Sequence, residues 1–554
     1  MKKNYTSFLI ITATLILLSC QDDVLDTRID TQLTEEMIAA DYEVLWDFGY
    51  ASYANVRNGF SSLDNNLFAA ATDEAEQTTP SSESQLFNEG SWSAFNNPDD
   101  QYANAYMGIR NVNFFLDKSE NYVTFLALNR DTLSDNQLQY NKDVQDITWL
   151  RNEARVLRSY YYFETAKRYG DVPLVTQTLS IADNTNIPQT SFDEIIDFVV
   201  SEVDAVKGAL QSDWKLFDQA RDGRLTTGAA LALKSRALLY AASPLHNPSN
   251  DVSKWQQAAA AAHEVIALNQ YALDDDYQDL FLEDNTVLSP EVIWAIRLGE
   301  TNVLEIQNYP IGTPGGNSGV TPSHNLVSAY EYLGAPDPLD PYANRDPRLG
   351  YSIVTNNSEW NDRTIEIWDG GLDASTNTNS SKTGYYLKKF LNPDLNLVQG
   401  EEELRSWIVF RYAEILLNYA EAMNEAYGTD NDNGLGMTAR QALNTIRSRP
   451  GVAMPDVVAA SQAEMRERIK HERRIELAFE GHRYWDLLRW QEAESVLNQP
   501  LQGIRAVKNA DESFTYTEFT VEPRAFVAPK MYYYPIPQTE ISKSQGVLQQ
   551  NPGW

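Results

Sequence analysis

Two stretches in the last third of the chain decide its fold: residues 407–417, WIVFRYAEILL, and residues 471–487, HERRIELAFEGHRYWDL. Apolar residues recur in both at spacings of three and four, which predicts helices over residues 407–427 and 461–491. Charged residues of the second stretch lie mostly three or four positions apart, which suits ion pairs along the helix and bonds to neighbouring loops. We interpret this charged set as structural rather than ligand-binding: Arg473, Arg474, Glu476, Glu480, Arg483 and Asp486.

The same periodicity predicts further helices over residues 149–169, 191–210, 229–242, 255–268 and 438–448. Ser191 and Glu194 form a capping box at the start of one of them. Residues 270–400 are rich in Gly, Pro, Asn, Asp and Ser, and only short strands are expected there, at 292–296, 364–368 and 385–390. The Pro- and Gln-rich tail, 532–554, is not expected to be helical. Paired helices with small residues at their crossings predict a mainly α fold of stacked tetratricopeptide-like hairpins.

The N-terminus has the pattern of a lipoprotein signal. Lys2 and Lys3 precede an apolar run of eleven residues, 8–18, which is followed by Cys20. Eleven residues span about half of a ~30 Å hydrocarbon layer, so we interpret residues 1–19 as a cleaved signal peptide. Cys20 is the only cysteine in the chain, which excludes an intrachain disulfide and fits a lipidated first residue of the mature protein. Residues 20–31 would then form a flexible tether.

Charge and aromatic content restrict the partners. The formal net charge is −34, so nucleic acids and anionic membrane surfaces are poor partners. Thirty tyrosines and twelve tryptophans are compatible with sugar binding, because the C–H face of a pyranose packs on an exposed ring. An aromatic core would give the same composition.

Several motifs together resemble the SusD/RagB family. They include the two stretches above and residues 419–422 (YAEA), 442–449 (ALNTIRSR), 534–537 (YPIP) and 550–554 (QNPGW). Residues 153–155, 169–174, 340–342 and 345–348 also fit. The resemblance covers nearly the whole chain. It implies a single SusD-like domain over residues 32–554, with a helical scaffold mainly at 32–60, 100–270 and 405–491. A loop-rich ligand-binding portion would lie mainly at 61–100 and 271–404.

The resemblance also implies a function. Members of the family are non-enzymatic outer-membrane lipoproteins that capture a glycan and pass it to a SusC-like TonB-dependent transporter. Cys20 would carry the lipid. The acidic pair Asp22 and Asp23 resembles a surface-export signal of Bacteroidetes lipoproteins, which would place the protein on the cell exterior, although a solvated acidic linker has the same composition. We expect no cofactor and no metal.

Glycan-binding residues are expected where rings and polar groups occur together in irregular segments, at 73–100 and 300–369. The candidates are Asp73, Glu76, Trp92, Asn96, Tyr309, Trp360 and Trp368. No family motif carries them over, because ligand-binding aromatics vary with the glycan. For any single ring, a core role is an alternative.

Other functions remain open at this point. A peptide-capturing lipoprotein of the same family is the main alternative. A glycoside hydrolase needs two carboxylates about 5–9.5 Å apart, which some pair among 78 acidic residues will meet, but the family resemblance argues against it. The five histidines lack the spacing of a zinc hydrolase, and residues 430–433 could bind calcium or form a solvated turn. The glycan could be algal, either neutral like laminarin or sulfated like ulvan. A polyanion would need a local positive site, for which the candidates are Arg57, Arg110, Arg345 and Arg363.

Overall fold

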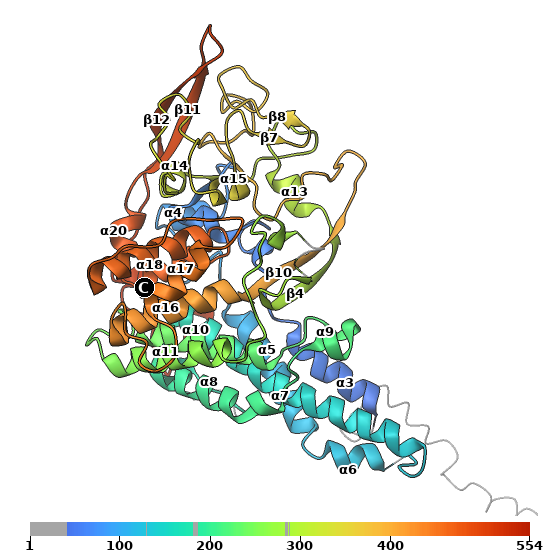
Figure 1. Ribbon diagram of the computed structural model, residues 1–554. Helices are drawn as coiled ribbons and strands as arrows, with labels where there is room; N and C mark the ends of the chain where they lie inside the picture. Colours follow the sequence, from blue (N-terminus) through green and yellow to red (C-terminus); the bar gives the residue numbers. More distant parts are fainter. Residues whose placement is uncertain (1–40, 129, 181–186, 283–285, 287) are drawn as a thin grey trace, which may run out of the picture.

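The computed structural model describes residues 41–554 apart from 129, 181–186, 283–285 and 287. Helices gather in the lower part of Figure 1, and irregular segments with short strands form the upper part. The predicted mainly helical class is therefore confirmed. The predicted signal peptide, Cys20 and the tether to residue 31 lie outside the described residues.

Helices that follow one another in the chain pack together and build the lower part. The main helices are α3 (Tyr42–Tyr50), α5 (Tyr102–Lys118), α6 (Tyr122–Ala127), α7 (Asn136–Tyr169), α8 (Phe192–Val206), α10 (Thr227–Ala242), α11 (Val252–Ile266), α16 (Tyr412–Tyr427), α17 (Ala439–Arg447) and α18 (Gln462–Glu476). α5 and α8 pack on α7, α11 packs on both α10 and α16, and α17 and α18 pack on α16. This is the predicted arrangement of stacked helical hairpins.

α7 is longer than its apolar pattern predicts. It begins at Asn136 rather than at residue 149, and it ends at Gly170, whose φ is 70°. Its first turns are polar and mostly exposed, so they show no apolar stripe, yet they are linked by bonds such as Gln139 Nε2 to Asp143 Oδ1, 2.7 Å. α8 begins after Ser191, and the predicted capping box with Glu194 is confirmed.

The first deciding stretch is part strand and part helix. β10 (Glu403–Arg411) pairs antiparallel with β4 (Val292–Thr301), and α16 begins only at Tyr412. The predicted helix from residue 407 is therefore wrong over its first five residues, which read WIVFR. β-branched and aromatic residues favour a strand where a partner strand is present, and β4 supplies that partner.

The second deciding stretch is two helices rather than one. α18 ends at Glu476, and α19 (Arg483–Arg489) follows after a turn in which Phe479 has φ 67° and Gly481 has φ 78°. The predicted continuous helix over 461–491 is therefore wrong. A left-handed residue ends an α-helix, and Gly adopts that conformation without strain.

The charged residues of this stretch make tertiary contacts instead of the predicted pairs along one helix. Glu476 bonds Arg348, Arg411 and Arg449, and Arg473 Nε donates to Asp486 Oδ2 across the turn at 2.7 Å. Arg474 and Arg483 both bind a carboxylate of the loop-rich part. Their structural interpretation, with bonds to neighbouring segments, is confirmed.

The upper part contains short paired strands. They are β1 (Ala75–Gln77) with β5 (Val320–Pro322), β6 (Ile353–Val354) with β9 (Tyr386–Leu387), and β7 (Glu359–Trp360) with β8 (Arg363–Thr364). The strands predicted at 364–368 and 385–390 are reduced to β8 and β9. Smaller elements between them include α4 (Ser84–Asn88), α13 (Val303–Asn308), α14 (His324–Val327) and α15 (Arg348–Ser352). β2 (Val172–Pro173) pairs with β3 (Gln189–Thr190) beside α7.

A hairpin that the sequence analysis did not predict completes the upper part. β11 (Leu501–Lys508) pairs antiparallel with β12 (Phe514–Glu522), and its tip projects beyond the neighbouring loops in Figure 1. The preceding helix is α20 (Ala493–Leu497). The tail is mostly irregular, as predicted, but it holds one short helix, α21 (Gln538–Lys543), so the prediction of no helix is wrong there.

Candidate functional site

Five of the seven predicted glycan-binding side chains are buried. Asp73 and Glu76 are ion-paired in the interior, and the rings of Trp92, Tyr309 and Trp360 are 1%, 0% and 3% exposed. A polysaccharide has no access to these groups here. The prediction that these five side chains contact a glycan is therefore not supported by their positions.

The two buried acids link the loop-rich part to the C-terminal segments. Asp73 accepts from Arg474 Nη2 at 2.8 Å and from Arg483 Nε at 2.9 Å. Burial opposes its charge, but the two guanidinium groups lower its pKa below the usual range. Glu76 pairs with Arg524 at 2.7 Å, while burial and the neighbouring Glu522 carboxylate raise its pKa. Both carboxylates therefore act in tertiary contacts.

The three buried rings pack on other aromatics. Trp92 stacks on Phe87, with centroids 5.0 Å apart and planes at 30°, and its ring also contacts Trp554 at 4.5 Å. Tyr309 and Trp360 meet edge to face at 5.3 Å. These are core contacts that join distant parts of the chain.

The remaining two candidates reach the surface at different places. Asn96 is exposed in a tight turn that is closed by a bridge to Ser93, and Phe95 beside it is 84% exposed. Trp368 is partly exposed, and its ring lies 5.3 Å from that of Phe514 on β12, with the planes at 34°. The structure does not bring Asn96 into contact with Trp368. Among the predicted rings, Trp368 is the one that belongs to a larger group of aromatic rings at the surface.

That group is a row of four partly exposed rings, Trp368, Phe514, Tyr516 and Tyr342, which we call the aromatic row. Phe514 and Tyr516 are two residues apart on β12, so both project from the same face of the hairpin. Their centroids are 6.2 Å apart, and Tyr516 meets Tyr342 edge to face at 5.6 Å. Rings from three separate segments therefore form one continuous surface.

The hairpin holds its share of the row in place through its register with β11. Tyr516 is opposite Ala506 and Phe514 is opposite Lys508. Two backbone bonds fix β11 to the loops: Ile504 N donates to Thr383 O at 2.8 Å, and Asp369 N donates to Ala506 O at 3.0 Å. The second bond sets Trp368, the preceding residue, beside the hairpin.

Polar groups flank the row. Asn356 Nδ2 donates to Tyr516 Oη at 3.2 Å, and Lys508 Nζ lies 5.1 Å from the centroid of Trp368. Arg505 Nε donates to Asp369 Oδ2 at 2.9 Å. Near the other end, His324 Nε2 is 3.3 Å from the exposed Glu518 carboxylate, and burial lowers the pKa of His324. Flat rings with hydrogen-bonding neighbours are suited to stacking the faces of sugar rings.

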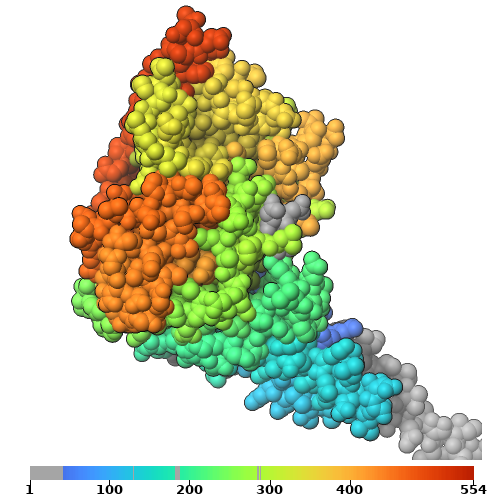
Figure 2. Space-filling view, in the orientation of Figure 1, coloured from blue at the N-terminus to red at the C-terminus, as the bar shows by residue number. Residues whose placement is uncertain are grey.

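Figure 2 shows the row's surroundings at the upper end of the molecule, where the red hairpin stands against the yellow segments near residues 330–370. The sequence analysis missed Phe514, Tyr516 and Tyr342. A usable signal was the start of β12, FTYT, in which two aromatic residues alternate with Thr, the period of a half-exposed strand.

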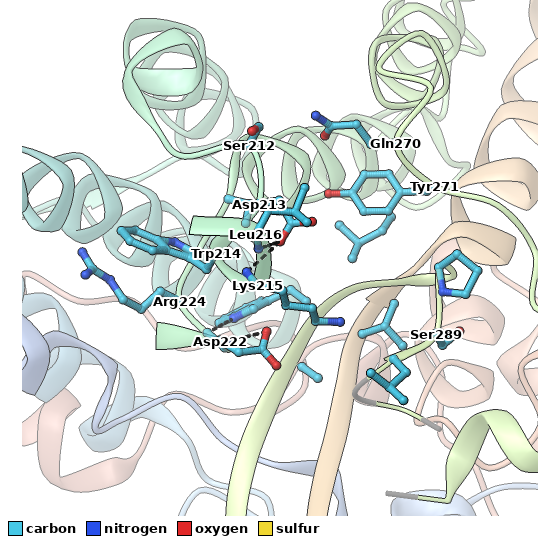
Figure 3. Close-up of a pocket in the computed structure, with 18 of the residues that line it drawn as sticks. Ser212, Asp213, Trp214, Lys215, Leu216, Asp222, Arg224, Gln270, Tyr271 and Ser289 are labelled. Carbon is cyan, nitrogen blue, oxygen red and sulfur yellow. Dashed lines mark hydrogen bonds between the residues drawn. The ribbon is translucent and has the colours of Figure 1, made fainter. Parts of the chain in front are cut away.

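A separate cavity of about 380 Å³ lies in the helical part, between α9 (Trp214–Phe217) and β4. Figure 3 shows Tyr271 on one side of it and, on the other, Leu216 of α9 and Asp213, which caps that helix. Its arginines are paired: Arg297 bonds Asp222, and Arg224 binds Glu153 at 2.8 Å. The cavity suits a small molecule rather than a polymer, so we do not take it as the main site.

Two searches of the described residues bear on other classes of function. Among them, no group of three or more His, Cys, Asp or Glu side chains is arranged to hold a metal ion. None of the helices described is both long enough and apolar enough to cross a membrane. Asp430, in the segment considered for calcium, binds Arg440 Nε at 2.7 Å.

Comparisons with known proteins agree with the motif resemblance. A model described as the SusD family matches residues 290–554, and one described as starch-binding and associating with the outer membrane matches residues 23–239. SusD-like protein P38 of Formosa agariphila is 27% identical over 380 residues, which are 64% of this chain and 68% of that protein.

Solved structures share the fold over nearly the whole chain. A SusD-like protein of Bacteroides fragilis, 26% identical, has a TM-score of 0.76 over 93% of this chain and 98% of its own. A laminarin-binding SusD-like protein, 22% identical, has a TM-score of 0.64 over 93% and 99%. The two family models together show that the chain belongs to the SusD/RagB family, whose members include proteins described as starch-binding or carbohydrate-binding.

Proposed function

We propose that this protein captures a polysaccharide or oligosaccharide at the cell surface through the aromatic row and passes it to a SusC-like TonB-dependent transporter. The observation that carries the proposal is the row itself. Four partly exposed rings from separate segments form one surface, in a chain whose family is carbohydrate-binding.

The extended form of the row, in which four rings follow one another across three segments, supports a polymeric ligand. A long glycan chain continues beyond any contact, so a row open at its ends accommodates it better than a closed cavity of small-molecule size. The partly exposed rings of Trp368 and Phe514 can each stack a sugar face, and the exposed Glu518 carboxylate can accept hydrogen bonds from hydroxyls.

The remaining parts of the proposal rest on the sequence. Lipid on Cys20 would anchor the protein to the outer membrane, and the acidic pair Asp22 and Asp23 would direct it to the exterior. Several acyl chains anchor firmly, since each buried methylene contributes about 0.8 kcal/mol. We propose a binding role without catalysis. In support, one of the two matching family models is described as starch-binding.

The test is affinity electrophoresis of the soluble form that starts after Cys20, in gels containing laminarin, starch, xylan, ulvan or pectin. We expect at least one polysaccharide to retard the protein, with no product released on prolonged incubation. Phe514→Ala and Trp368→Ala should each abolish most of the retardation. Tyr50→Ala is the matched control, because Tyr50 is a 48% exposed ring on α3, in the helical part.

Each outcome decides between specific alternatives. If all three variants are retarded as strongly as the natural protein, the aromatic row is not the binding site. Release of shorter products would indicate a hydrolase. If no polysaccharide retards the protein while it binds a peptide mixture, the peptide-capturing alternative replaces the proposal.

A further inference from the structure

The charges around the aromatic row restrict the kind of glycan that it can bind, an inference that rests on the proposed function. A sulfated or uronic polysaccharide carries an anionic group on many of its sugars, so it requires several cations along its path. Four arginines were candidates from the sequence: Arg57, Arg110, Arg345 and Arg363.

Three of the four arginines make other contacts in the structure. Arg363 binds both oxygens of Asp373 at 2.7 Å, and Arg57 bonds Asp99. Arg345 lies over the ring of Tyr332, with its guanidinium carbon 3.8 Å from the centroid, and its Nη1 donates to Tyr330 O at 2.7 Å. Arg363 and Arg57 are neutralised by their carboxylate partners. Arg345, whose Nε donates to Pro341 O at 3.1 Å, keeps its charge beside the Tyr342 end of the row, where the exposed Glu518 and Asp340 oppose it.

The fourth arginine is remote, and the cations beside the row are few. Arg110 is exposed on α5, which belongs to the helical part. Arg505 is neutralised by Asp369. Lys508, over the ring of Trp368, is a single positive charge at one end of the row.

Acidic groups surround the same surface. Glu518 lies on β12 with 70% of its side chain exposed, and exposed Asp511 and Glu512 occupy the hairpin turn. Exposed Asp340 accepts from Tyr342 N at 2.9 Å, next to the end of the row. These carboxylates add to a chain whose net charge is −34. A polyanion that follows the row would meet like charges at both ends.

We propose that the glycan bound by the aromatic row is uncharged, and that sulfated and uronic polysaccharides are excluded by the acidic groups around it. Stacking on rings does not require ligand charge, and hydroxyl groups can bond carboxylates as well as amides. The acidic surroundings are therefore compatible with a neutral chain and unfavourable for an anionic one.

The test compares neutral laminarin, starch and mannan with anionic ulvan and pectin in affinity gels, at about 10 mM and about 150 mM salt. The Debye length falls between these conditions from about 30 Å to about 8 Å, so a charge effect shows as a salt effect. We expect a neutral polysaccharide to retard the protein at least fivefold more than either polyanion. Retardation should vary less than twofold with salt and disappear in Phe514→Ala.

The outcomes separate this inference from the proposed function. Clear retardation by ulvan or pectin overturns the inference and leaves glycan capture in place. Retardation by a neutral glycan that survives both Phe514→Ala and Trp368→Ala also overturns it, because the charge argument concerns the row. If no polysaccharide retards the protein, the proposed function and the inference fail together.

Discussion

Arg411 Nη1 donates to Glu476 Oε1 at 2.7 Å, which joins the last residue of β10 to the last residue of α18. The two stretches that decide the fold meet at this bond. The Arg411 side chain is 2% exposed and that of Glu476 is fully buried. Arg411 also binds Glu291 and Glu480, so one guanidinium group holds three segments together.

We expect Arg411→Met to lower the free energy of unfolding by about 3–5 kcal/mol, because the substitution leaves buried carboxylates without their cation. Urea unfolding monitored by tryptophan fluorescence measures the change. Arg505→Gln is the matched control, since the Arg505 side chain in its pair with Asp369 is 60% exposed and such pairs contribute about 0–1 kcal/mol. Equal losses in the two variants would contradict the structural role assigned to Arg411.

Gly481 gives a second stability prediction, because it lies in the turn between α18 and α19 with φ 78°. A Cβ at this position would meet no atom within 4 Å, so backbone strain alone opposes a side chain. We expect Gly481→Ala to cost about 1–2 kcal/mol in unfolding free energy.

Gly350 is the control for this substitution. A Cβ there also meets nothing within 4 Å, but Gly350 lies within α15 and has no positive φ. Gly350→Ala should be neutral or stabilising by up to about 1 kcal/mol. A loss at Gly350 as large as that at Gly481 would show that the left-handed conformation is not the cause.

The same turn shows how far the sequence predicts this fold. Periodicity located α8, α10, α11, α17 and the second half of α7, which bury apolar residues against their neighbours, but it did not predict α3, α5 or α6. It failed at 477–482, where the apolar spacing continues through Gly481, and at 407–411, where β4 supplies a strand partner more than a hundred residues earlier in the chain. Both errors arise where tertiary contacts override a local pattern.

The candidate site was predicted less well than the fold. Trp92 and Trp360 occur in the expected irregular segments, but both rings are interior. Trp92 lies outside any helix or strand, and β7, with two residues, is too short for a period to reveal the burial of Trp360. Trp368 was predicted, whereas Phe514 and Tyr516 were not, because their strand lies beyond the segments chosen as loop-rich. Only the folded chain places residue 368 beside residue 514.

The aromatic character of position 514 can be tested separately from its hydrophobicity. We expect Phe514→Trp to retain the binding of the responsive polysaccharide, and Phe514→Leu to weaken it about two- to tenfold, since aromatic contacts contribute about 0.5–1.5 kcal/mol beyond buried area. Isothermal titration calorimetry with a defined oligosaccharide measures both. Equal affinity of the Leu and Trp variants would show that stacking on this ring is not part of recognition.

The titration of Glu74 should make the stability of the protein depend on pH. This side chain is buried next to Asp73, and burial, with the neighbouring carboxylate, raises its pKa to about 7 in the folded protein from 4.5. Between these two pH values the folded state binds more protons than the unfolded state, so its stability falls as pH rises. The contribution of protonated Glu74 to the free energy of unfolding is fully present below about pH 4.5, and about 3 kcal/mol of it is lost by pH 7.

Glu74→Gln removes this titration and keeps a side chain of similar size. We therefore expect the variant to gain stability relative to the natural protein as pH rises from 5 to 8, by about 2–3 kcal/mol in unfolding free energy. Urea unfolding of both proteins at pH 5 and pH 8 gives the difference between their unfolding free energies. The titration of other groups affects both proteins alike and largely cancels in this difference. A difference between the two proteins that is the same at pH 5 and pH 8 would mean that Glu74 is ionised in the folded state over the whole range.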